Sequence, residues 1–145
     1  MKKALLTTRN FLIAVMTTFI AASVLHSQFV LAELTAIGIN VSMSDRITMT
    51  LSDVSGLLVG YGAIITLSLL LGFLIMQAIN KWLFSLPDWR FAIGGFIAIA
   101  TALLAMQPLF NITLIASARS ELGFLSQCFA GAIGGLVYAR IYKAA

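Results

Sequence analysis

The sequence predicts an all-α integral membrane protein, a bundle of four transmembrane helices. Three observations predict it: a charged fraction of only 10%, a hydrophobic fraction of 61%, and four long apolar stretches within 145 residues. A soluble domain carries about 25% charged residues, and apolar surface left in water costs about 25 cal/mol per Å². Lipid tolerates such a surface, so the bilayer is the first expected partner.

Four apolar stretches have the length of a membrane span. They cover about residues 11–32, 57–79, 91–110 and 122–142. About 20 helical residues cross the hydrocarbon core of a bilayer. In lipid every backbone N–H and C=O must pair within its own segment, which requires each stretch to be helical. The chain 1–145 is therefore expected to form a single transmembrane domain.

Two of these spans have a second interpretation. The first follows Met1-Lys2-Lys3 and ends near Val30-Leu31-Ala32, as a signal peptide with its cleavage site would. Its apolar run is longer than the usual signal-peptide core of about 7–15 residues, so we expect a retained helix. In the third span, Pro108 can kink or end a helix. We expect residues 109–118 to lie along the outer membrane interface, with continuation past a kink as the alternative.

Basic residues set the expected orientation. One side of a four-span arrangement holds Lys2, Lys3, Arg9, Lys81, Arg90, Arg140 and Lys143. The other side holds only Arg46 and Arg119. Because cytoplasmic loops carry the excess of lysine and arginine, both termini are expected in the cytoplasm. The basic start and the short loops are typical of a bacterial inner-membrane protein.

The segment 35–54 is the one sizeable polar stretch, and it is expected outside the membrane. Its apolar residues alternate with polar ones on both sides of Ser44-Asp45-Arg46. Alternation with a period of two favours a short β-hairpin. A surface helix that carries Met43 and Ile47 on one face is the alternative.

Small residues spaced four apart are the strongest local signal, because they let two helix backbones approach closely. The expected helix-packing residues are Gly94, Ala98, Gly123, Gly131, Gly134 and Gly135. These residues could pack the bundle internally. Alternatively, those of the fourth stretch could join copies of the chain or bind another membrane protein.

Polar residues near the outer ends of the spans form a second candidate set. His26, Gln28, Gln107 and Gln127 are the expected lining of an outer polar mouth. No Asp, Glu, Lys or Arg falls near the middle of an apolar stretch, which disfavours ion-coupled transport. A small oligomeric channel or a passive transporter of a small solute stays open.

No residue set predicts catalysis, a cofactor or a metal. The outer carboxylates Glu33, Asp45, Asp53 and Glu121 could join His26 in a metal or acid–base site, but none of them has a metal-ligand spacing. Cys128 is the single cysteine and is expected to pack in the bilayer. The net charge of +4 comes without a basic stripe interleaved with aromatics, so nucleic acid is not an expected partner. We expect a non-enzymatic subunit or scaffold that acts through helix–helix contacts. A channel is the alternative, and a membrane enzyme that uses His26 is a more remote one.

Overall fold

The computed structural model describes residues 2–82, 89–110 and 120–144, and every regular element in these ranges is an α-helix. The four helices are α1 (Lys2–Ala36), α2 (Met43–Trp82), α3 (Arg90–Phe110) and α4 (Glu121–Ala144). The all-α prediction is therefore confirmed. Three helical segments are long and apolar enough to cross a membrane, namely Leu6–Ala36, Met43–Asn80 and Glu121–Tyr142. The apolar segment Arg90–Met106 of α3 is shorter.

α1 ends in a Schellman motif at Gly38. The backbone N–H of Gly38 donates to the carbonyl of Thr35 at 3.0 Å, and that of Ile39 donates to the carbonyl of Leu34 at 3.1 Å. These two bonds cap carbonyls that the end of a helix leaves unpaired. They require a left-handed backbone at the residue after the cap, and Gly38 has a φ of +87°. Glycine adopts this conformation without steric cost, so the chain turns sharply here toward α2.

The β-hairpin prediction for residues 35–54 is wrong, because α2 begins at Met43. Ser42 and Asp45 form a reciprocal cap: the Ser42 hydroxyl accepts the Asp45 N–H at 3.2 Å, and the Asp45 carboxylate accepts the Ser42 N–H at 2.9 Å. Met43, Ile47 and Leu51 are spaced four apart and share one helix face. The same apolar residues therefore fit a helix as well as a strand.

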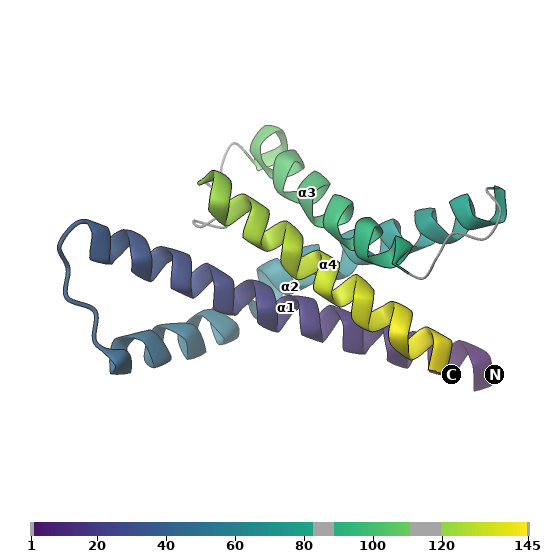
Figure 1. Cartoon of the computed structure of the whole chain (residues 1–145), viewed down its shortest axis with the longest axis horizontal. Coiled ribbons are helices and arrows are strands. Elements are labelled where there is room, and N and C mark those ends of the chain that lie inside the picture. The colour runs from purple at the N-terminus through teal and green to yellow at the C-terminus, as the bar shows by residue number, and fades with distance from the viewer. Residues whose placement is uncertain (1, 83–88, 111–119, 145) are drawn as a thin grey trace.

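α2 is much longer than its expected span. Its 40 residues correspond to about 60 Å at 1.5 Å per residue, against a hydrocarbon core of about 30 Å. In Figure 1, α2 crosses the pair formed by α1 and α4 at a large angle. Residues 43–54, which were expected in an outer loop, form the first turns of α2.

α3 includes Pro108 in its last turn and ends at Phe110. Residues 109 and 110 therefore still belong to α3. The rest of that expected segment, 111–118, lies outside the described residues. The two exposed tryptophans, Trp82 and Trp89, stand at the end of α2 and immediately before α3.

The four helices pack in a ring, each mainly against its two neighbours in the order α1, α2, α3, α4 and back to α1. All neighbouring pairs are antiparallel, so the first residues of α1 lie near the last residues of α4 (Figure 1). The core contains Phe19, Ile65, Leu69, Ile99 and Leu103. Aromatic rings fill the end near the termini: the Phe73 ring lies 4.7 Å from that of Tyr138 and 5.5 Å from that of Phe91, measured between centroids.

Candidate functional site

Glycines bring α3 and α4 into backbone contact. A β-carbon added at Gly131 would lie 2.6 Å from Ile99 Cγ1 and 3.0 Å from the carbonyl carbon of Gly95, and closer still to that carbonyl's oxygen. A β-carbon at Gly95 would meet the Gly131 carbonyl in the same way. One turn further along, Gly135 packs on the backbone of Phe91. Close approach through small residues is the usual way to gain van der Waals contact where lipid gives no hydrophobic drive.

The remaining expected packing residues make further contacts inside the chain. A β-carbon at Gly134 would lie 2.9 Å from the Ala14 carbonyl oxygen of α1. A β-carbon at Gly94 would lie 2.7 Å from Met76 Cγ of α2, and the Ala98 side chain would meet one at Gly72 at 2.8 Å. Gly123 is buried near the start of α4. The face of Gly131, Gly134 and Gly135 is thus occupied by α1 and α3, which leaves it no room for a second copy of α4.

A buried polar cluster joins α1 and α2. The Ser27 hydroxyl lies 2.7 Å from Asp53 Oδ2 and 3.0 Å from the Ser23 carbonyl oxygen, and its single proton can be donated to only one of them at a time. His26 is buried and lies close to Asp53. The Ser23 hydroxyl is buried, with no hydrogen-bond partner among the described residues. Asp53 therefore belongs to an interhelical contact and not to a free loop.

Deeper in the bundle, Gln127 of α4 forms hydrogen bonds to both α1 and α2. Its Oε1 accepts a hydrogen bond from the Tyr61 hydroxyl of α2 at 2.9 Å, and its Nε2 donates to the Ala22 carbonyl of α1 at 3.2 Å. Gln127 and Tyr61 are both almost fully buried. Buried amide and hydroxyl groups are costly unless they are paired, so this arrangement specifies how α1, α2 and α4 meet.

The structure does not bring the expected mouth residues to one opening. His26 faces the Asp53 cluster, and Gln127 is deep in the bundle. Gln28 is about 200° from His26 around α1 and accepts a hydrogen bond from Arg46 Nη1 at 3.0 Å. The side chain of Gln107 lies outside the described part of the chain. Gln28 therefore lies apart from His26, on another side of α1, whereas Gln127 bonds to the Ala22 carbonyl one helical turn from His26.

The sequence contains signals for interhelical contacts that were not predicted from it. Ser23 and Ser27 are polar and four apart within an apolar stretch, which places both on one helix face. Arg46 and Asp53 are seven residues apart, about two helical turns, once α2 is extended to Met43.

Among the described residues no group of three or more His, Cys, Asp or Glu could hold a metal ion. Cys128 is a free, buried cysteine.

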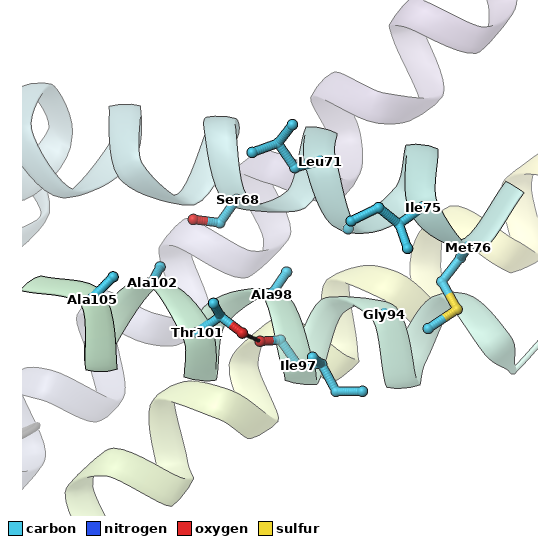
Figure 2. A pocket seen from close by; sticks show the side chains of 11 residues that line it. Ser68, Leu71, Ile75, Met76, Gly94, Ile97, Ala98, Thr101, Ala102 and Ala105 are labelled. Carbon is cyan, nitrogen blue, oxygen red and sulfur yellow. Dashed lines mark hydrogen bonds between the residues drawn. The ribbon is translucent and has the colours of Figure 1, made fainter. Parts of the chain in front are cut away.

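A shallow apolar groove runs along the seam between α2 and α3 on the outside of the bundle. Small residues of α3, Ala98, Ala102 and Ala105, form its floor, and Leu71 and Ile75 of α2 form one rim (Figure 2). Its volume is about 280 Å³. The hydroxyls of Ser68 and Thr101 donate to carbonyls of their own helices, those of Ile64 and Ile97. The groove therefore offers an apolar surface with little free hydrogen-bonding capacity.

Comparison of the chain with protein-family models, with curated proteins and with solved structures finds no match.

Proposed function

We propose that this chain is a bacterial inner-membrane protein whose four helices all span the bilayer, with both termini in the cytoplasm. The 21 residues of α3 correspond to about 31 Å, which suffices for a span. The antiparallel ring puts the charge-rich helix ends on one side, where seven of the nine basic residues fall. Trp82 and Trp89 are exposed at that end, as interfacial tryptophans are. α1 contributes Phe19 and Ala22 to the core, which favours its retention over cleavage.

Within the membrane, the protein acts as a non-enzymatic subunit that binds a partner through helix–helix contacts. One observation carries this proposal: the groove over α2 and α3 has a floor of small residues and a rim of large ones. Small residues favour helix packing in lipid, and the glycine face of α4 is already occupied. The occupant that fits is one transmembrane helix of another membrane protein, laid along Ala98, Ala102 and Ala105.

Filling the groove tests this function. A photo-crosslinking residue in place of Thr101 is expected to join the chain to one defined membrane protein in native membranes. Adding Ala102→Leu fills the floor and is expected to reduce that crosslink about tenfold or more, since each 1.4 kcal/mol of lost contact is a factor of ten. Leu104→Phe is the matched control, because Leu104 is exposed on α3 outside the groove.

Three results would contradict parts of the proposal. A crosslinked species of twice the chain mass would show that the partner is a second copy of this chain and not another membrane protein. A crosslink that survives Ala102→Leu would remove the groove as the docking surface. Reporter fusions that place Lys81 outside the cytoplasm would reverse the orientation and leave the groove untouched.

A small channel or passive transporter is the second candidate. It is favoured by the polar cluster in which half-buried Asp53 lies against buried Ser23, His26 and Ser27. Ionisable residues between membrane helices usually mark a pathway or a site. Under this proposal, Asp53→Asn should change solute or proton flux in reconstituted vesicles at least about tenfold. Asp45→Asn is the control, because Asp45 is exposed at the start of α2. Equal flux for Asp53→Asn and the unaltered chain would remove this candidate.

A further inference from the structure

A second groove lies between α1 and α2 near the Gly38 turn. Its volume is about 580 Å³. The residues that line it are Val24, Gln28, Met43, Arg46, Ile47, Thr50 and Leu51. Most of these are apolar, and one cation stands among them. Neither the subunit function nor the buried Asp53 cluster accounts for this groove.

Arg46 carries a positive charge that no described carboxylate neutralises. Its half-buried guanidinium bonds to the Gln28 amide oxygen, a neutral acceptor, at 3.0 Å, and this is its side chain's one hydrogen bond within the described ranges. The neighbouring Asp45 is engaged with Ser42. Guanidinium offers five N–H donors in a planar fork, so several remain for a ligand. Because Gln28 accepts through its oxygen, its amide N–H₂ is directed elsewhere and is a further donor.

The groove has a polar end and an apolar end. Since α1 and α2 are antiparallel, Gln28 and Arg46 lie toward the Gly38 turn, and Val24 and Leu51 lie toward the middle of the bundle. Val24, Ile47 and Leu51 are all exposed. The groove thus offers donors for an anion at the bundle's end and an apolar wall that runs inward from it. This is the polarity of a phospholipid that lies parallel to the helices.

We propose that this groove binds one anionic phospholipid, with its phosphate at Arg46 and Gln28 and an acyl chain along Val24, Ile47 and Leu51. Guanidinium matches phosphate with paired, charge-assisted hydrogen bonds. A half-buried site strengthens that attraction relative to water. The negative charge of an anionic headgroup would neutralise Arg46. A zwitterionic headgroup has no net charge and would leave the positive charge of Arg46 uncompensated. The inference rests on the proposed membrane insertion of the chain.

Lipid retention tests the groove. The chain is reconstituted in vesicles of phosphatidylcholine with a minor fraction of phosphatidylglycerol, extracted in mild detergent and weighed by native mass spectrometry. One phosphatidylglycerol is expected to stay bound. Arg46→Gln should weaken its retention about tenfold, the scale of a lost charge-assisted hydrogen bond, while Arg46→Lys should retain part of it. Leu51→Ala should weaken retention by a smaller factor.

Two matched controls isolate the groove. Arg140→Gln removes an exposed charge at the opposite end of the bundle, and Leu58→Ala removes an exposed leucine of α2 outside the groove. Both should keep the lipid, and circular dichroism should show equal helicity for all variants. Equal retention of phosphatidylcholine and phosphatidylglycerol, or full retention by Arg46→Gln, would overturn the inference. If inorganic phosphate alone displaced the lipid, the groove would be a binding site for a small anion and not for a phospholipid. Failure to insert into either vesicle would instead refute the proposed function, and this inference with it.

Discussion

Replacing Gly131 by alanine is expected to destabilise the folded bundle by about 1–3 kcal/mol, the usual cost of overpacking a well-filled interior. The added methyl group would overlap the Gly95 carbonyl, which belongs to a helix backbone and cannot rotate away as a side chain does. α3 and α4 would have to separate, and their contacts along Phe91, Gly95 and Ile99 would loosen together. Unfolding with increasing SDS mole fraction, followed by far-ultraviolet circular dichroism, measures the change.

Gly95→Ala should have a similar effect, because Gly95 meets Gly131 from the other side. The double variant should cost less than the sum of the two, since the separation made for one methyl group also relieves the other. Gly60→Ala is the matched control. A β-carbon at Gly60 has nothing within 4 Å, and alanine is favoured over glycine inside a helix by about 0.5–1 kcal/mol. The control should therefore change stability in the opposite direction. If Gly131→Ala changed the stability in the same way as Gly60→Ala, the close crossing of α3 and α4 would be disproved.

These glycines also show how far the sequence could predict the fold. Spacing of four selected Gly131 and Gly135, because a regular small-residue face is visible in the sequence itself. It could not select Gly95, whose neighbours at that spacing are Phe91 and Ile99. A side chain at Gly95 has no room only because the backbone of Gly131, in another helix, lies against it. Sequence periodicity reveals one face of one helix, and the pairing of faces is a tertiary property.

The polar contacts were harder to predict for a related reason. The alternation around Asp45 fits a strand and a helix equally, and the local cap from Ser42 decides for the helix. Once Asp53 was assigned to a loop, its contact with Ser27 could not be anticipated. The acidic residue was thus identified, but its contact between two helices depends on where α2 begins.

Gln127→Leu is expected to destabilise the protein by about 1–3 kcal/mol, although leucine has nearly the same size. The substitution leaves the buried Tyr61 hydroxyl without its acceptor at 2.9 Å and the Ala22 carbonyl without its interhelical donor. An unpaired buried polar group carries its full desolvation penalty, whereas replacing both partners by apolar groups of the same shape can be almost neutral. The loss should therefore come mainly from Tyr61.

Tyr61→Phe supplies the decisive second variant. Added to Gln127→Leu, it removes the stranded hydroxyl, and the double variant should recover most of the lost stability. Ser126→Ala is the control, because within the described ranges Ser126 bonds only to the Gly123 carbonyl of its own helix. This substitution should change stability by no more than about 0.5 kcal/mol. The same SDS titration measures all four variants. Strictly additive losses for Gln127→Leu and Tyr61→Phe would mean that the two side chains do not interact. α2 and α4 would then lack the hydrogen bond between Tyr61 and Gln127 that joins their side chains across the ring.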